Sequence, residues 1–325
     1  MGTAIETQVE NWDRVYAALR EGVGMELRPE YGVLILRDAD RVDFLQRMTT
    51  NNIAALHPGQ STVTVLTSAT ARILFVFTVV CREDDLLLLP AAGEAASLAK
   101  HLRGNIFFMD KVAVDDVSEH YRRLRTMGPQ ADVCLPPDGA NLTGAGDGAW
   151  AQLNGVIFVK QLTYDVPGYE ILVPNDHFES FMARLADAGV SVRQDASAYN
   201  ARRIELGRPA PAHEATSDYS PLEAGLAWTC AEDKGCYTGQ EIIARQITYD
   251  KVTKKLVGLR SDEAFDTGAI VTTDSGKKIG AVTSVAPRLG LALAIVNRAY
   301  ADAGTQVVAG KAAAEVITMP FENIG

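Results

Sequence analysis

The sequence predicts an α+β fold that ends in a small β-barrel, and two observations carry this prediction. Up to about residue 250, strand-like segments are mixed with segments that have helical periodicity and helix-capping residues. From residue 251 onward, short strand-like segments dominate, as expected for an all-β barrel. The chain of 325 residues is long enough for more than one domain, so we expect an α+β region at 1–250 and a barrel at 251–325.

In the first region, strands are expected where apolar and β-branched residues cluster between turn residues. These strands are 32–36, 61–67, 73–81, 86–89, 112–117, 121–127, 156–162 and 169–173. Helices are expected at 40–48 behind Asp40, at 93–102, at 176–188 behind the Asp176 and Glu179 capping pattern, and at 198–206 before Gly207.

Two segments of this region are predicted to be irregular. The stretch 131–148 is rich in Gly, Pro and Asp and predicts a surface loop. The stretch 208–225 carries Pro209, Pro211 and Pro221, and a loop of that length in a compact domain is more often functional than idle.

The barrel is predicted from six short strand-like segments near the C-terminal end. They are 255–259, 269–273, 279–285, 292–296, 306–308 and 314–318. Asp274, Ser275 and Gly276 form a hairpin turn between the second and third of these segments.

Composition excludes several classes of function. The formal net charge of −10 and the absence of a long basic run argue against direct binding of nucleic acid. The longest mainly apolar run, 73–81, is about half of a membrane span, so no membrane partner is expected. Residues 1–20 lack an apolar signal core and contain Glu6 and Glu10, which predicts a cytoplasmic protein.

The cysteines and histidines predict no metal site made by the protein alone. Cys81, Cys134, Cys230 and Cys236 are irregularly spaced, as expected in a reducing compartment. Cys230 and Cys236 are too far apart for a Cys-x-x-Cys zinc knuckle, and the histidines are scattered.

The most informative stretch for function is Lys-Gly-Cys-Tyr-Thr-Gly-Gln-Glu at 234–241. Thr238 and Glu241 have the spacing of a capping box, which predicts a helix start, with Tyr237 and Ile242 as its hydrophobic staple. Cys236 would then lie near the positive end of the helix dipole, beside the charge of Lys234. Both effects favour the thiolate, so Cys236 and Lys234 are the candidate catalytic residues.

The competing interpretation is that Cys236 is a small hydrophobe packed in the core, which is the usual role of an isolated cysteine. Gln240 and Arg245 either line the same site or are solvated helix positions, and the sequence leaves both readings open.

The 234–241 motif and six further segments resemble the YgfZ branch of the glycine-cleavage T-protein superfamily, over nearly the whole chain. The 234–241 motif is present unbroken. The further segments are Phe44-Leu45-Gln46 with Thr49, the strand 167–174 with Gly-Tyr-Glu, Arg203 to Gly207, the loop Pro221 to Leu226, and the barrel elements at 280–284 and 320–321.

This resemblance implies a three-lobed T-protein-like arrangement, two lobes in 1–250 and the barrel after them, with tetrahydrofolate or a related folate in a central cavity. Tyr169, Glu170 and Arg203 would be the cofactor-binding residues. Glu170 would accept hydrogen bonds from the pterin ring, and Arg203 would pair with a carboxylate or hold the pocket in shape. Without the resemblance, Glu170 would be an ordinary polar residue on a strand face.

The chain also departs from the T-protein pattern. In the enzyme, an Asn-Ala…Asp segment follows the strand that here ends near Leu89, whereas 90–97 of this chain contain no Asp. The Gly-Gly-Ile-x-Asp-Asp segment of the T-protein is replaced by 71–76, Ala-Arg-Ile-Leu-Phe-Val. Losing these carboxylates removes the means of holding and protonating an aminomethyl substrate, so aminomethyl transfer is not expected.

The resemblance therefore implies a folate-binding accessory factor for iron–sulfur cluster assembly or repair, with assembly proteins and client enzymes as partners and Cys236 as the reactive thiol. Two alternatives stay open. A tetrahydrofolate-dependent aminomethyl or methyl transferase would need a carboxylate from elsewhere, such as Asp84 or Asp85. A folate-binding module without chemistry would use Cys236 only for packing.

Overall fold

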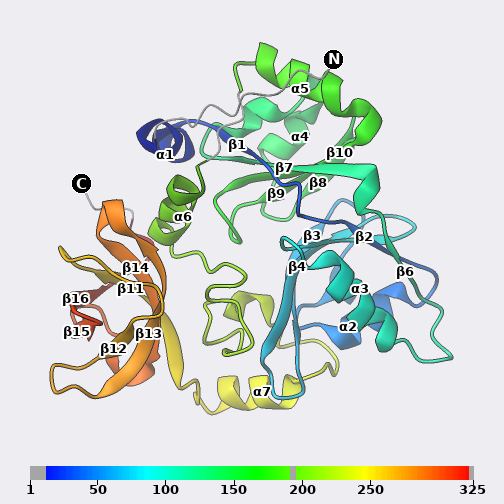
Figure 1. Ribbon diagram of the computed structural model, residues 1–325. Helices are drawn as coiled ribbons and strands as arrows, with labels where there is room; N and C mark the ends of the chain where they lie inside the picture. Colours follow the sequence, from blue (N-terminus) through cyan, green and yellow to red (C-terminus); the bar gives the residue numbers. More distant parts are fainter. Residues whose placement is uncertain (1–11, 191–194, 322–325) are drawn as a thin grey trace.

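The computed structural model describes residues 12–190 and 195–321, so Glu6 and Glu10 lie outside the described residues. Figure 1 shows two sheet lobes and a separate C-terminal barrel, joined by α6 (Ala196–Glu205) and an irregular connection. The predicted α+β class and the three-lobed arrangement are confirmed. Within the described ranges, no helix is long and apolar enough to cross a membrane.

The first sheet forms one lobe with α2 (Arg41–Met48) and α3 (Ala95–Gly104). Its strands, in spatial order, are β3 (Ser61–Thr67), β4 (Ile73–Cys81), β5 (Leu86–Pro90), β2 (Leu34–Arg37) and β6 (Ala113–Asp116). The helices bury Phe44, Leu45 and Leu98 against this sheet, which closes one hydrophobic core. The paired strands predicted at 61–67 and 73–81 are confirmed, with antiparallel register.

The second sheet forms the neighbouring lobe and brings strands from distant parts of the chain together. In spatial order they are β1 (Gly24–Leu27), β7 (Tyr121–Met127), β10 (Gly168–Pro174), β9 (Val156–Gln161) and β8 (Trp150–Leu153). The helix α5 (Phe178–Asp187) covers one face with Phe181 and Leu185. The other face packs against the first sheet through a cluster in which Ile35 and Leu87 meet Ile157 and Leu172.

The barrel is closed by six strands, so none of its strands leaves an unpaired edge. They are β11 (Lys254–Arg260), β14 (Leu291–Asn297), β13 (Lys278–Ala286), β12 (Ile270–Thr272), β15 (Gln306–Ala309) and β16 (Ala312–Ile317). The helix α6 packs on the outside of the barrel through Ala201 and Ile204 and also contacts α1 (Trp12–Glu21). The predicted strand segments of the barrel are confirmed.

Three local predictions are wrong. The Asp176 cap does not form, because residues Asn175–His177 make a 3-10 turn and His177 occupies the cap position of α5. Asp40 does precede α2, but its carboxylate accepts the backbone N–H of Lys111 at 2.8 Å instead of capping the helix. The predicted loop 131–148 contains short helical turns, including α4 (Ala140–Thr143).

Candidate functional site

A cavity of about 620 Å³ lies between the lobes, and both sheets, α6 and the irregular segment after α6 line it. Its lining residues include Glu26, Arg28, Tyr31, Val76, Thr78, Glu94, Arg123, Tyr164, Asp165, Glu170, Tyr199, Arg203, Arg208 and His213. The irregular segment contributes residues 208–213, which agrees with the expectation that this loop has a role. Cavities that hold drug-sized ligands are of this size, on the order of 300–1,000 Å³.

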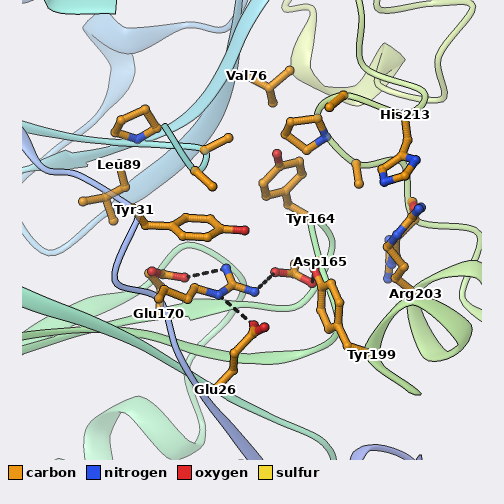
Figure 2. A pocket seen from close by; sticks show the side chains of 18 of the residues that line it. Glu26, Tyr31, Val76, Leu89, Tyr164, Asp165, Glu170, Tyr199, Arg203 and His213 are labelled. Carbon is orange, nitrogen blue, oxygen red and sulfur yellow. Dashed lines mark hydrogen bonds and ion pairs between the residues drawn. The ribbon is translucent and has the colours of Figure 1, made fainter. Parts of the chain in front are cut away.

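A buried ion cluster forms the floor of the cavity, where Figure 2 shows Glu26, Asp165 and Glu170 joined by dashed lines to one guanidinium, which belongs to Arg28. The Arg28 guanidinium donates to Asp165 at 2.9 Å, to Glu170 at 3.2 Å and to Glu26 at 3.2 Å. Burial alone would raise the pKa of Asp165, but the charges of Arg28 and Arg125 outweigh burial and hold this pKa below its ordinary value. Asp165 is therefore held in its ionised form, and the floor carboxylates are paired with Arg28.

Glu170 belongs to this cluster and is only 1% exposed. Its Oε1 accepts from Nε of Arg123 at 2.8 Å, and Arg125, its register partner on β7, lies within 3.9 Å. Arg123 also donates to the carbonyls of Gly32 and Pro90, so it ties the two sheets together. The predicted residue Glu170 thus lines the cavity, with both carboxylate oxygens already bonded to arginine.

Tyr169, the neighbouring predicted residue, lies on the opposite face of β10. Successive side chains of a strand point to opposite faces, so Glu170 faces the cavity while Tyr169 packs in the core under α5. The Tyr169 hydroxyl donates to Asp132, and Tyr169 is not among the cavity-lining residues. We therefore correct the expectation that Tyr169 touches a ligand in this cavity.

Arg203, the third predicted binding residue, lies on α6 and is 2% exposed. It pairs with the carboxylate of Glu214 at 3.1 Å and donates to Ser284 of the barrel at 2.6 Å and to the carbonyl of Arg208 at 3.1 Å. These bonds join α6, the irregular segment and the barrel, so Arg203 holds the cavity wall in shape.

Several lining residues, chiefly Arg28, Arg123 and Asp165, were not predicted from the sequence. The sequence does carry one indication of this cluster, the arginines of β7, the strand beside that of Glu170. Charged residues inside a sheet are expected to be paired with opposite charges. Arg28 follows β1, which was not predicted, and Asp165 lies in the loop after β9. Only the tertiary structure brings these three segments together.

Glu94, a further missed residue, lies at the start of α3, inside the stretch 90–97 that contains no Asp. Its Oε2 atom is buried and has no hydrogen-bond partner within residues 12–190 and 195–321. Burial raises the pKa of Glu94 to about 6. The cavity therefore holds a carboxylate, that of Glu94, from the stretch that lacks the Asp of the T-protein.

Asp84 and Asp85, the carboxylates considered for a transferase, are not cavity residues. They lie in the turn between β4 and β5, where Asp84 is exposed and Asp85 forms an ion pair with Arg82. Neither is placed to serve chemistry in the cavity, since neither lines it.

The capping-box prediction at 238–241 is wrong. The helix α7 (Gln240–Thr248) begins after Gly239, which has φ +85° and no side chain to cap the helix. The Thr238 backbone is held by α2 and β3 instead: its N–H bonds to Arg47 and its carbonyl to the Thr67 hydroxyl. Tyr237 packs on Ile243, while the predicted staple partner Ile242 is exposed.

Lys234 is 8% exposed and its ammonium points at the backbone after α2. It donates to the carbonyls of Gln46 and Asn51, each at 2.7 Å, and to that of Thr49. Burial lowers the pKa of Lys234 to about 8. The thiol that interacts electrostatically with the Lys234 ammonium is that of the buried Cys230. Lys234 thus caps α2 and anchors the loop, and its hydrogen bonds within the described residues go to these carbonyls and not to Cys236.

Cys236 is exposed, whereas Cys81, Cys134 and Cys230 are buried free thiols. The interpretation of Cys236 as core packing is therefore wrong. Cys236 does not line the central cavity, and neither do Gln240 and the exposed Arg245, which are helix-surface positions. In the described part of the chain, no three metal-ligating side chains gather into a metal site.

Two family models match consecutive parts of the chain. The GCVT N-terminal domain matches residues 6–234, and the CAF17 C-terminal beta-barrel domain matches residues 253–320. The three-lobed fold around a cavity and the first match define the class. The chain belongs to the family of the GCVT N-terminal domain, and the predicted membership of the YgfZ-type branch of the T-protein superfamily is confirmed.

Similar proteins agree with this assignment. A putative chloroplastic transferase of Arabidopsis thaliana is 30% identical over 285 residues; the match covers 85% of this chain and 64% of the relative, so this chain spans under two-thirds of its length. An aminomethyltransferase of Caldanaerobacter subterraneus is 27% identical, and the match covers 94% of this chain and 85% of the relative. The solved structure of the glycine cleavage system aminomethyltransferase T of Bartonella henselae has the same fold, with a TM-score of 0.83 and 22% identity. The match covers 96% of this chain and 89% of that chain.

Proposed function

We propose that this protein binds a reduced folate in the central cavity and acts as an accessory factor for iron–sulfur cluster assembly or repair, with Cys236 as its reactive thiol. The observation that carries the proposal is the pairing of a cavity lined by charged side chains with an exposed cysteine outside it. The barrel match to CAF17 and the T-protein-like fold support the folate-related class.

The cavity residues fit a reduced pterin. A pterin ring presents N–H donors along one edge and an aromatic face. The cavity offers the rings of Tyr31 and Tyr164 and, on Glu94, a buried carboxylate oxygen that has no hydrogen-bond partner among the described residues. Arg203 and the ion cluster keep the walls rigid, which lowers the ordering cost of binding. A bound folate would supply one-carbon chemistry or a binding signal.

Cys236 suits contact with another protein because its side chain is accessible while its loop is fixed. Lys234 and Gly239 hold the loop on α2 and on the β3–β4 turn. A thiol in a fixed, exposed loop is available to sulfur or metal chemistry with an iron–sulfur assembly protein or client enzyme. We place this activity in a reducing compartment, the cytoplasm in our proposal, since the four cysteines are free.

The test is iron–sulfur enzyme activity in cells that lack this protein, complemented with the wild type, Cys236→Ser or the exposed-site control Ser275→Ala. We expect the wild type and the control to restore activity and Cys236→Ser to fail at equal protein level. Equal rescue by Cys236→Ser would remove the thiol from the proposal. Unchanged iron–sulfur enzymes in the deletion strain would refute the assembly role.

A second candidate is aminomethyl or methyl transfer to tetrahydrofolate. The observation that favours it is Glu94, a carboxylate that lines the cavity from the stretch lacking the T-protein Asp, together with relatives named aminomethyltransferase. Purified protein that turns over an aminomethyl donor with tetrahydrofolate, and loses this activity in Glu94→Gln, would establish the transferase.

A further inference from the structure

The carboxylates of the central cavity fall into two kinds. Glu26, Asp165 and Glu170 are bonded to the guanidinium of Arg28. Glu94 is different, because its Oε2 is buried without a hydrogen-bond partner in the described part of the chain. A buried polar atom left unpaired costs free energy, on the order of 1–3 kcal/mol, so such an atom in a cavity points to a ligand that satisfies it.

Three other parts of the fold line the cavity together with Glu94. Tyr31 follows β1 and bridges to the segment just before Glu94, and Tyr164 comes from the loop after β9. Arg208 and His213 face the same cavity from the irregular segment. Of these, Tyr164 is close enough to Glu94 for an electrostatic effect: burial raises the pKa of the Tyr164 phenol, and the Glu94 carboxylate raises it further.

Aromatic rings and burial define the surroundings of Glu94 in the cavity. Figure 2 shows Tyr31 and Tyr164 above the ion cluster, on the side of Val76 and Leu89. The backbone N–H of Ala91 favours the ionised form of Glu94, but burial dominates and raises the pKa of Glu94 to about 6.

We propose that Glu94, and not Glu170, is the carboxylate that receives the N–H donors of the cavity's ligand, with the Tyr164 ring beside it as part of the same binding wall. The ligand class is a flat heterocycle with adjacent ring and amino N–H groups, such as a reduced pterin. Its identity as a folate rests on the proposed function. Glu170 is unsuited because its oxygens already bind Arg28 and Arg123.

Binding of the ligand to Glu94 is coupled to release of a proton from this carboxyl group. Hydrogen bonds from ligand N–H groups favour the ionised carboxylate, so binding lowers the pKa of Glu94 from about 6. Near pH 6 the free protein carries a proton on Glu94 about half of the time, and binding expels it. Affinity therefore falls as pH drops below 6, by up to about tenfold per pH unit.

The experiment is anaerobic titration calorimetry with tetrahydrofolate between pH 5.5 and 8, repeated in two buffers of different ionisation enthalpy to count protons. We expect the wild type to release protons near pH 6. Glu94→Gln should bind about tenfold or more weakly at pH 8 and release no proton. The control Glu83→Gln, in the exposed β4–β5 turn, should match the wild type.

The outcomes separate the two proposals. If the wild type binds tetrahydrofolate and Glu94→Gln keeps both affinity and proton release, the Glu94 assignment is overturned and the folate proposal stands. If the wild type and Glu83→Gln do not bind tetrahydrofolate, the folate proposal fails and the assignment fails with it. A melting temperature of Glu94→Gln at pH 8 no lower than that of the wild type excludes misfolding as the cause.

Discussion

The Nε atom of Arg123 lies 2.8 Å from Oε1 of Glu170, and this bond joins β7 to β10 under the central cavity. Arg123 reaches from there to the carbonyls of Gly32 and Pro90, so one guanidinium ties the second sheet to the first. The cavity floor is thus part of what holds the two sheet lobes together, and its residues are expected to contribute to stability before any ligand binds.

Glu170→Gln is expected to lower the free energy of unfolding by about 3 kcal/mol, because removing one partner leaves buried guanidinium charges uncompensated. Urea denaturation measures this. The control is Glu26→Gln: the Glu26 side chain is more exposed, and its carboxylate bonds to Arg28 alone among the described residues, so its loss should cost about 1 kcal/mol. Equal costs for the two variants would show that the buried cluster is not the source of stability.

Glu94→Gln is expected to stabilise the ligand-free protein above about pH 6. The pKa of Glu94 is raised from 4.5 to about 6, so the folded state holds this proton more tightly than the unfolded state. Stability then falls as pH rises from about 4.5 through 6, and Gln removes this loss. Melting temperatures of the two proteins should coincide near pH 4.5 and diverge at pH 7.5. A lower melting temperature for the variant at pH 7.5 would contradict an unpaired carboxylate.

Thiol labelling should single out Cys236, because the other three cysteines are buried. Mass spectrometry of native protein treated with a maleimide should show one adduct, and unfolded protein should show four. Cys236→Ser should show none under native conditions. Native labelling of a second cysteine would mean that the loop or core opens on the time scale of the experiment.

Lys234→Met is expected to lower the free energy of unfolding by about 3 kcal/mol, since the carbonyls of Gln46, Thr49 and Asn51 lose their common donor. The exposed Lys255→Met is the control and should change stability by less than about 0.5 kcal/mol. If Lys234→Met kept full stability while slowing the labelling of Cys236, Lys234 would act on the thiol and not on the loop.

Gly239→Ala is expected to destabilise the protein by about 2 kcal/mol, because Gly239 has φ +85° and an added Cβ would lie 2.7 Å from the Ser68 carbonyl. Gly235→Ala, in the same loop, has open space around its Cβ position and should cost less than about 1 kcal/mol. Comparing the two variants by urea denaturation separates the strain of the cap from general sensitivity of the loop.

Much of the secondary structure follows from local pattern. The strands at 61–67, 73–81 and 121–127 were predicted with the bounds that the structure has, because β-branched and apolar residues cluster there between turns. The caps were less predictable. Asp176 and Thr238 have the residue type and spacing of helix caps, but 3-10 geometry at Asn175–His177 and the left-handed Gly239 start the helices later.

The sequence alone determined the fold class, the barrel and the family, since each rests on periodicity or on contiguous motifs. Tertiary structure decided which residues share the cavity, because Arg28, Glu94 and Asp165 come from segments far apart in the chain. It also decided how side chains are used. Strand alternation turned Tyr169 away from Glu170, and the three carbonyls after α2 took the ammonium of Lys234 that sequence proximity had assigned to Cys236.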